Sequence, residues 1–197
     1  MHKKYCVYDI RGSCASGKST LVRNILKRYE NEVILDEDIP YHWVPELNLC
    51  ILGRYDMKGS GVDNVKGSDR IQSFMESKLK HHNVMLEGVI ISHVFARWNE
   101  MASSKKWKYR FFHLNVDLDT CIERVKKRRL KRGDKRPFNP ENTTRFLTQT
   151  AKTIGKLKDA GRWVMVLDNP TKKEAYLAVI RQIKKDLKKQ SNHEEEE

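Results

Sequence analysis

Short apolar runs alternate with longer amphipathic segments along the chain, and this alternation predicts a repeat of strands and helices. Four of the five apolar runs are rich in β-branched or aromatic residues. They lack a clean alternation of apolar and polar positions, which indicates strands that are buried on both faces of a parallel sheet. The predicted strands span residues 5–10, 32–36, 83–87, 110–115 and 163–167.

The segments between these strands have the apolar spacing of helices that cover a sheet. In the segment 69–82, Ile71, Phe74 and Met75 share one face, and Ser68 is a candidate N-cap. Alternating strands and helices imply an α/β domain whose parallel sheet is covered on both sides and whose ligands bind at the carboxyl ends of the strands. The predicted helices span residues 18–29, 69–82, 118–131, 143–160 and 172–189.

A phosphate-binding motif joins the first predicted strand to the first predicted helix. Residues 12–19 match G-x-x-x-x-G-K-[ST] in full, in the strand–loop–helix context that the motif requires. The N–H groups of such a loop bind phosphate, Lys18 reaches the β- and γ-oxygens, and the Ser19 hydroxyl ligates Mg²⁺. We therefore expect ATP and Mg²⁺ as cofactors. The expected nucleotide contacts are Gly12, Ser13, Cys14, Ala15, Ser16, Gly17, Lys18, Ser19 and Thr20.

Other motifs favour a kinase among the P-loop proteins. The chain has no N-K-x-D for guanine, and the D-x-x-G at 56–59 follows no predicted strand. Carboxylates stand instead at the ends of the second and third predicted strands, in Asp36-x-Asp38 and at Glu87. Each of these carboxylates also fits a plainer role, as a helix cap, a turn residue or a structural hydrogen-bond acceptor.

The order of the elements and the D-x-D pair resemble the nucleotide and small-molecule kinases, such as the adenylate, shikimate and gluconate kinases. The resemblance implies a three-layer P-loop NTPase fold with a five-stranded parallel sheet in the order 2-3-1-4-5. It assigns catalytic roles at the acceptor to Asp36 and Asp38, with Asp36 also ligating the metal. Glu87 would lie beside the phosphate loop, where it would contact substrate or hold the metal through water.

An arginine-rich run extends this resemblance to a lid. The sequence R-V-K-K-R-R at 124–129, followed by Arg132, is similar to the start of the lid in adenylate-kinase-like proteins. It implies a mobile lid over about residues 128–142, with Arg124 by the adenine and with Arg128 and Arg132 at the transferred phosphate. The plainer alternative is a basic, solvated helix.

The stretch between the second and third predicted strands is expected to build the acceptor site, as an insertion over about residues 39–82. It holds four of the ten glycines, so its backbone is free to approach a ligand closely. All of its polar residues could instead organise an irregular loop. The expected substrate contacts are Arg54 for an anion, Tyr55 for stacking on a ring, Asp63 or Asp69 for a hydroxyl or imide hydrogen, and Arg70 and Glu87 beside them.

Two stretches, Gly53-Arg-Tyr with Ser60-Gly-Val-Asp63 and Leu86-Glu-Gly-Val-Ile-Ile-Ser92, resemble the 5-hydroxymethyluridine DNA kinases of bacteriophages with hypermodified thymine. The resemblance implies transfer of the γ-phosphoryl group to the 5-hydroxymethyl group of 5-hydroxymethyluracil in phage DNA. A kinase must enclose its acceptor against water, which is compatible with a base flipped out of the DNA but leaves open whether it is. Two other classes stay open. One is a nucleoside or nucleoside-monophosphate kinase acting on free nucleotides, and the other is a nucleic-acid-binding P-loop ATPase that works as a switch.

The charge balance supports a polyanionic partner such as DNA. The chain has 39 Lys and Arg against 26 Asp and Glu, a net charge of +13. Such an excess favours association with phosphate backbones, because neutralising each phosphate releases counterions. A solvated basic surface is the plainer alternative.

The remaining features bound the organisation of the chain. None of the four cysteines belongs to a CxxC pair or to a Cys/His cluster with zinc spacing, which is typical of reduced thiols. Neither a signal peptide nor an apolar run of membrane-spanning length is found, so we expect a cytoplasmic protein without a membrane partner, in the host cytoplasm if phage-encoded. We expect one kinase domain over 1–190 and a disordered acidic tail over 191–197. No pattern predicts an oligomeric state.

Overall fold

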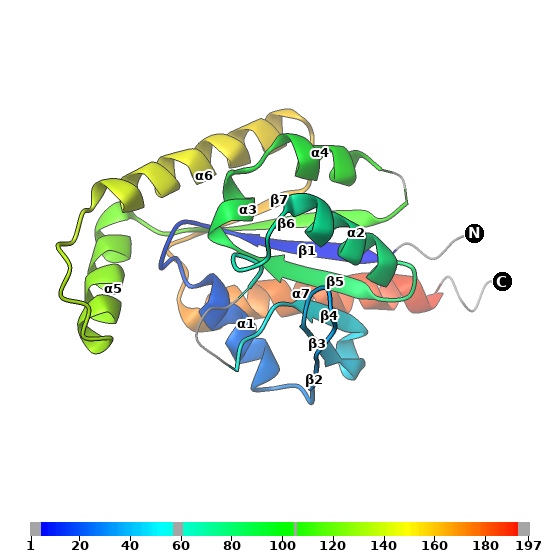
Figure 1. Ribbon diagram of the computed structural model, residues 1–197. Helices are drawn as coiled ribbons and strands as arrows, with labels where there is room; N and C mark the ends of the chain where they lie inside the picture. The colour runs from blue at the N-terminus through cyan, green and yellow to red at the C-terminus, as the bar shows by residue number, and fades with distance from the viewer. Residues whose placement is uncertain (1–4, 57–60, 105, 193–197) are drawn as a thin grey trace.

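Alternate residues of the central strand face opposite sides of one sheet, and both sides are apolar. The computed structural model describes residues 5–56, 61–104 and 106–192 (Figure 1). In strand β1 (Cys6–Arg11), Tyr8 and Ile10 pack on one side of the sheet and Val7 on the other. Because both faces must be covered, helices lie above and below the sheet, and the fold is a three-layer α/β sandwich.

The sheet has seven strands in the order β2-β3-β4-β5-β1-β6-β7. Strands β4, β5, β1, β6 and β7 pair in parallel, and the antiparallel strands β3 and β2 extend the sheet beyond β4. The strands other than β1 are β2 (Glu32–Ile34), β3 (Tyr41–Val44), β4 (Leu49–Leu52), β5 (Asn83–Glu87), β6 (Lys108–Asn115) and β7 (Val164–Asp168).

The prediction of a five-stranded, fully parallel sheet is wrong in the number of strands and in one assignment. The segment 32–36 contributes only the short edge strand β2, and β4 takes the place beside β5 that this segment was expected to fill. The parallel part has the 2-3-1-4-5 pattern once β4 is counted as the second strand. β4 gives a weak sequence signal because it is four residues long, although all four are buried.

Helices cover both faces, and two short ones were not predicted. Helix α2 begins at Ser68, so Gly67 takes the N-cap position instead. Helix α7 continues to Asn192, and residues 193–197 of the predicted tail lie outside the described residues. The helices are α1 (Lys18–Leu26), α2 (Ser68–Lys78), α3 (Val89–His93), α4 (Ala96–Ser103), α5 (Leu118–Lys131), α6 (Glu141–Asp159) and α7 (Lys172–Asn192), with a 3₁₀ turn at Pro45–Leu47.

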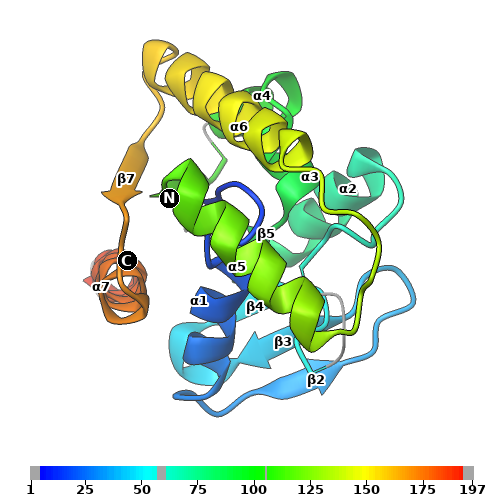
Figure 2. The same cartoon turned by 90° about the vertical axis from the view of Figure 1, so that its left-hand side faces the viewer.

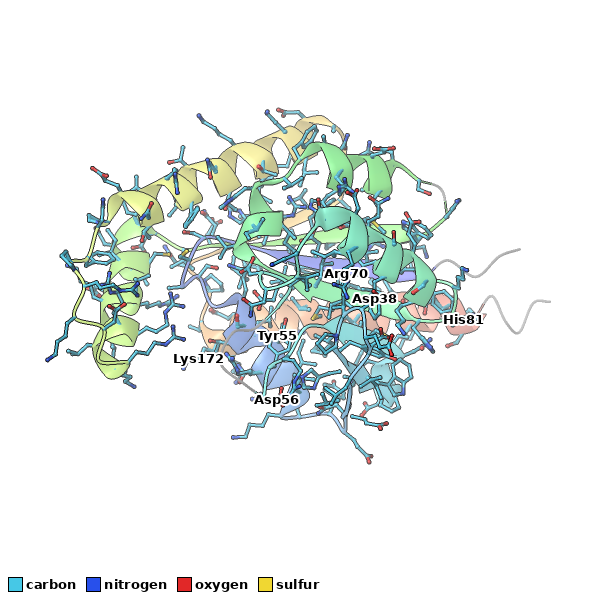
Figure 3. The ribbon with its side chains drawn as sticks, in the orientation of Figure 1. Asp38, Tyr55, Asp56, Arg70, His81 and Lys172 are labelled. Atoms are coloured by element: carbon cyan, nitrogen blue, oxygen red, sulfur yellow. The ribbon has the colours of Figure 1, made fainter. Side chains whose placement is uncertain are left out.

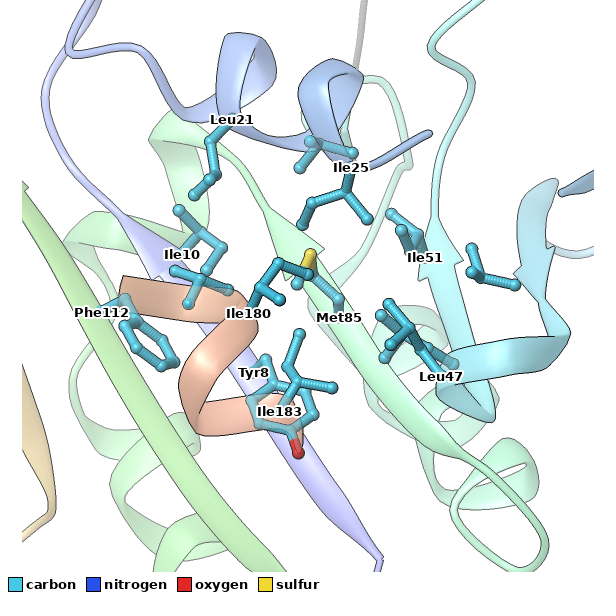
Figure 4. Packing of buried hydrophobic residues seen from close by; sticks show 14 of the residues in the cluster. Tyr8, Ile10, Leu21, Ile25, Leu47, Ile51, Met85, Phe112, Ile180 and Ile183 are labelled. Carbon is cyan, nitrogen blue, oxygen red and sulfur yellow. The ribbon is translucent and has the colours of Figure 1, made fainter. Parts of the chain in front are cut away.

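Each face of the sheet has its own apolar core. On one face, Leu21 and Ile25 of α1 and Ile180 and Ile183 of α7 pack against the central strands (Figure 4). The other face is covered by α2, α3, α4 and α6, and the fully buried Trp98 of α4 belongs to this second cluster. Burial of this apolar area is the main stabilising contribution to the sandwich.

Helix α5 and the start of α6 project beyond one end of the sheet as a helical hairpin, and the rest of α6 covers the sheet (Figure 1). In the view of Figure 2, α5 crosses in front of the loop that leads into α1. Asp117 caps α5, since its carboxylate accepts a 2.7 Å bond from the Thr120 N–H. The hairpin thus holds the basic face of α5 above the end of β1. No described helix combines the length and the apolar character that crossing a membrane requires.

Candidate active site

The phosphate-binding loop lies between the end of β1 and the start of α1, as its motif predicts. Gly17 adopts a left-handed conformation (φ 105°) that glycine tolerates best, and its carbonyl accepts the Leu21 N–H. The Lys18 ammonium lies inside the loop, where it donates to the carbonyls of Gly12 (2.8 Å) and Ser13 (3.0 Å). The loop N–H groups and this ammonium form a site for nucleotide phosphates.

A buried ion pair fixes the strand end that carries this loop. The Arg11 guanidinium donates to the Asp9 carboxylate at 2.8 and 3.1 Å, and both side chains are fully buried. Arg11 also donates to the carbonyl of Val94 after α3. Ser92 of α3 accepts the Gly12 N–H at 3.3 Å, so α3 is tied to the loop from two sides.

The loop opens into a cavity of about 1120 Å³, large enough for a nucleotide and an acceptor group. Its walls come from the segment after β4, the end of β5, helix α5 and the start of α7. Strands β4 and β7 lie on opposite sides of β1, so the walls that follow them face each other across the loop. The lining residues are 14–21, Arg23, Asp56, Asp63, Asn64, Glu87, Val89, Leu114, Arg124, Lys127, Arg128, Lys131, Arg132, Pro170, Thr171, Lys172 and Ala175.

Glu87 lies directly beside the first helical turn after the loop. The register Ile10↔Glu87 ends β5 level with β1, and the Ser19 hydroxyl donates to Glu87 Oε1 at 2.8 Å. Burial raises the pKa of Glu87, while the nearby Lys18 ammonium and the Ser19 hydroxyl lower it. A hydroxyl and a carboxylate oxygen at this spacing fit the preference of Mg²⁺ for oxygen ligands. No group of three His, Cys, Asp or Glu in the described ranges could hold a metal ion, so such an ion would rely on nucleotide phosphates for further ligands.

Asp63 is the second carboxylate fixed at the cavity wall. Its two oxygens accept the N–H groups of Val89 (2.9 Å) and Ile90 (3.0 Å) at the start of α3. The segment before it is docked onto β5, because the Val62 N–H donates to the Glu87 carbonyl. Backbone N–H groups thus hold the Asp63 carboxylate and the Ser19 hydroxyl holds that of Glu87, both at the carboxyl end of β5.

The basic face of α5 supplies the opposite wall. Arg124 donates to the Ala15 carbonyl of the loop at 3.3 Å. Arg128 and Arg132 line the cavity, and within the described part of the chain neither forms an ion pair. Arg129 points elsewhere and holds the connection after α5 by donating to Asp134 and to the carbonyls of Pro137 and Arg136.

Asp36 and Asp38, expected at the acceptor, lie outside the cavity lining. Asp36 accepts from Lys78 at 3.5 Å, and Asp38 forms an exposed ion pair with Arg70. The reason is the edge position of β2, which is four strands away from β1 in the sheet, about 19 Å at 4.8 Å per strand. In Figure 3, Asp38 and Arg70 lie together, apart from Asp56 and Lys172 of the cavity wall.

Three other expected acceptor contacts are also absent from the cavity lining. Tyr55 is buried in the core under α1, 6% exposed, so its ring is not offered for stacking. Arg54 is paired with Asp56. Asp69 is paired with Arg97 at the exposed start of α2. The arrangement brings together the phosphate loop, Asp63, Glu87 and the lid arginines from the predicted set.

Several cavity residues were not predicted. Lys127 and Lys131 share the face of α5 that carries Arg124 and Arg128, so helical spacing could have found them. Pro170–Lys172 follows β7, and the rule that ligands bind at the carboxyl ends of parallel strands pointed to it. Asn64 and Arg23 had no distinguishing sequence signal.

Comparison with known proteins identifies relatives of this chain. The profile of the 5-hmdU DNA kinase family matches residues 2–149. A 5-hmdU DNA kinase of Pseudomonas phage PaMx11 is 32% identical over 176 residues, covering 84% of this chain and 92% of the relative. A 5-hmdU DNA kinase of Delftia phage PhiW-14 is 25% identical over 178 residues, covering 80% of this chain and 66% of the relative.

Among solved structures, a chain of the Pnkp1/Rnl/Hen1 RNA repair complex superposes with a TM-score of 0.52 at 15% identity. The match covers 79% of this chain and 47% of that one, and at this identity it supports the fold alone. The extent of the profile match and the identity to the PaMx11 protein settle the relationship: the chain belongs to the 5-hmdU DNA kinase family.

Proposed function

We propose that the protein transfers the γ-phosphoryl group of ATP to the 5-hydroxymethyl group of 5-hydroxymethyluracil in DNA. The observation that carries the transfer chemistry is the convergence on one cavity of the phosphate loop, two fixed carboxylates, and Arg128 and Arg132, which form no ion pair among the described residues. The acceptor is supported by the activity in the family name and by the kinase names of two phage relatives.

The nucleotide half of the reaction uses the loop and α5. Loop N–H groups would hold the β-phosphate, and Lys18 would exchange its loop carbonyls for phosphate oxygens. Ser19 and Glu87 are the residues that would hold Mg²⁺, which when bound neutralises charge on the phosphates. Arg128 and Arg132 would neutralise the charge of the transferred phosphoryl group from the lid side.

The acceptor half needs a group that takes the proton of the attacking hydroxyl, and we assign this role to Asp63. Two N–H donors hold its carboxylate in place at the cavity wall. Asp56 suits the role less well, because its hydrogen bonds to Arg54 lower its pKa to about 2. Glu87 is already engaged by Ser19. A positioned carboxylate base of this kind contributes about 10²–10⁴-fold to the rate.

The charge of the chain fits a DNA acceptor better than a free nucleotide. Cations that line or border the cavity without an ion pair in the described ranges include Lys127, Lys131 and Lys172. They would contact the DNA backbone around the acceptor base and release counterions. The reaction would take place in the cytoplasm of the infected host.

The experiment offers [γ-³²P]ATP with four acceptors: an oligonucleotide containing 5-hydroxymethyluracil, the same oligonucleotide with thymine, free 5-hydroxymethyldeoxyuridine and its monophosphate. We expect label on the modified oligonucleotide alone. Efficient labelling of the free nucleoside or nucleotide would identify a small-molecule kinase. DNA-stimulated ATP hydrolysis without a labelled acceptor would identify an ATPase switch.

A further inference from the structure

A second, smaller cavity of about 230 Å³ lies behind the lid helix. It is lined by α5, the connection that follows α5, the start of α6 and the phosphate loop. Cys14 and Arg128 line both this cavity and the larger one. A group bound in the smaller cavity would therefore meet the larger one where the loop and a lid arginine face each other.

The walls of the smaller cavity suit a flat ring. Phe138 and Phe146 contribute aromatic surface from two different segments. Phe146 is held by stacking on His93, with ring centroids 5.0 Å apart and an interplanar angle of 18°. Phe138 is held by cations of α5, with Arg129 5.7 Å from its ring centroid. Nucleic-acid bases stack favourably on such aromatic side chains.

Two carboxamides border this cavity, and they differ in their bonding. Asn139 lies just before α6, where its Oδ1 accepts the Glu141 N–H and its NH₂ group donates to the Glu141 carboxylate. Asn142 accepts a 3.3 Å bond from Arg145 through Oδ1, and the NH₂ group opposite that oxygen has no hydrogen bond within the described ranges. Asn142 thus brings an unused N–H donor to the rim.

We propose that this cavity receives the acceptor base, flipped out of the DNA, with Phe138 and Phe146 packing on the ring and the Asn142 amide donating to the uracil O4. The inference rests on the proposed function and names the binding site within it. The cavity volume suits one pyrimidine and is too small for a nucleoside triphosphate. The shared wall at Cys14 and Arg128 would direct the 5-substituent to the transferred phosphate.

A donor at Asn142 has a consequence for base choice. Uracil presents a carbonyl at position 4, whereas cytosine presents an amino group there. Asn142→Asp replaces the donor by an acceptor, so kcat/KM on 5-hydroxymethyluracil DNA should fall about tenfold or more, within the range for one specific base contact. The ratio of kcat/KM on 5-hydroxymethyluracil DNA to kcat/KM on 5-hydroxymethylcytosine DNA should decrease, and KM for ATP should not change. Asn24→Asp, the same chemical change on α1 outside the lining of both cavities, should leave base preference as in the wild type.

A direct test locates the base in the wild-type protein. DNA with 5-iodouracil at the acceptor position is irradiated in complex with the protein, and the crosslinked tryptic peptide is sequenced. We expect the peptides 136–145 or 146–152, which contain Phe138 and Phe146. Crosslinks to residues 52–70 instead, or to neither of these peptides, would overturn the inference, as would an Asn142→Asp variant with unchanged base preference.

The two proposals fail separately. If the wild-type protein labels no DNA containing 5-hydroxymethyluracil, the proposed function is wrong. If it labels this DNA while the crosslink lies elsewhere and Asn142→Asp keeps its preference, only the location of the base is wrong.

Discussion

Replacing Gly61 by alanine tests whether the acceptor segment positions the metal-side carboxylate. A Cβ at position 61 would lie 2.3 Å from the Glu87 carbonyl oxygen and 2.7 Å from Glu87 Oε1. Gly61 also has a φ of 73°, in the left-handed region. Gly161 is the matched control, because its φ is 69° and a Cβ there would have no neighbour within 4 Å.

The two substitutions separate backbone strain from the steric clash. The left-handed conformation costs a residue with a Cβ about 1–2 kcal/mol, which is the whole cost expected for Gly161→Ala. Crowding against Glu87 adds about 1–3 kcal/mol, so Gly61→Ala should lose about 2–5 kcal/mol of unfolding free energy. For a chain of this size, Tm should fall by about 2–4 °C per kcal/mol.

The assay combines thermal denaturation with kcat measured over a range of Mg²⁺ concentrations. We expect Gly161→Ala to keep wild-type turnover, and Gly61→Ala to require more Mg²⁺ because the Glu87 carboxylate is displaced. Equal losses of stability in the two variants, with normal turnover and normal Mg²⁺ dependence for Gly61→Ala, would refute the contact between the segment and Glu87.

Four further predictions follow from the site. Asp63→Asn should lower kcat about 10²–10⁴-fold, whereas Asp36→Asn should stay near the wild type, and single-turnover rates compare them. Arg128→Ala should lower kcat by about 10³-fold or more with little change in Tm. Arg129→Ala should instead lower Tm, because Arg129 is bonded to the segment that follows α5; a stability loss in Arg128→Ala and a kcat loss in Arg129→Ala would contradict these roles. For a modified oligonucleotide, the slope of log K for binding against log salt concentration should be about −3 to −4, for roughly four phosphate contacts. ATP affinity should change much less with salt, and an oligonucleotide affinity that does not depend on salt would contradict a DNA acceptor. Because burial raises the pKa of Glu87, kcat/KM should fall as pH drops through that raised pKa and the carboxylate is lost. Over the interval between the ordinary and the raised pKa the folded state binds more protons, so stability should fall as pH rises; Glu87→Gln should abolish both the activity and this slope in urea denaturation.

The parts of the site that a contiguous motif specifies were predictable from sequence. The strand, loop and helix around Lys18 follow from one motif because its glycines and its lysine act within eight residues. Helix α5 begins and ends at the predicted residues, since its capping aspartate and its basic final turn are local signals.

The acceptor side was harder because it depends on which strands become neighbours. Assigning the second strand by its order along the chain put Asp36 at the acceptor and the metal, but the antiparallel pairing of β2 and β3 moves that segment to the sheet edge. Asp63 was one of several equivalent carboxylates in the sequence, and only its bonds to the α3 amides distinguish it. α3 itself is five residues long, too short for a periodic signal.

The bonds of Lys18 within its own loop affect how inactive variants are interpreted. Its ammonium is the donor that satisfies the carbonyls of Gly12 and Ser13. Nucleotide binding is therefore an exchange of partners, and the loop is held in shape before phosphate arrives. A truncated side chain at this position leaves two acceptors without their donor, at a cost of about 1–3 kcal/mol for each one that stays dry. Lys18 therefore also stabilises the conformation of the loop, and loss of activity in a Lys18 variant reports on the integrity of the loop as much as on catalysis.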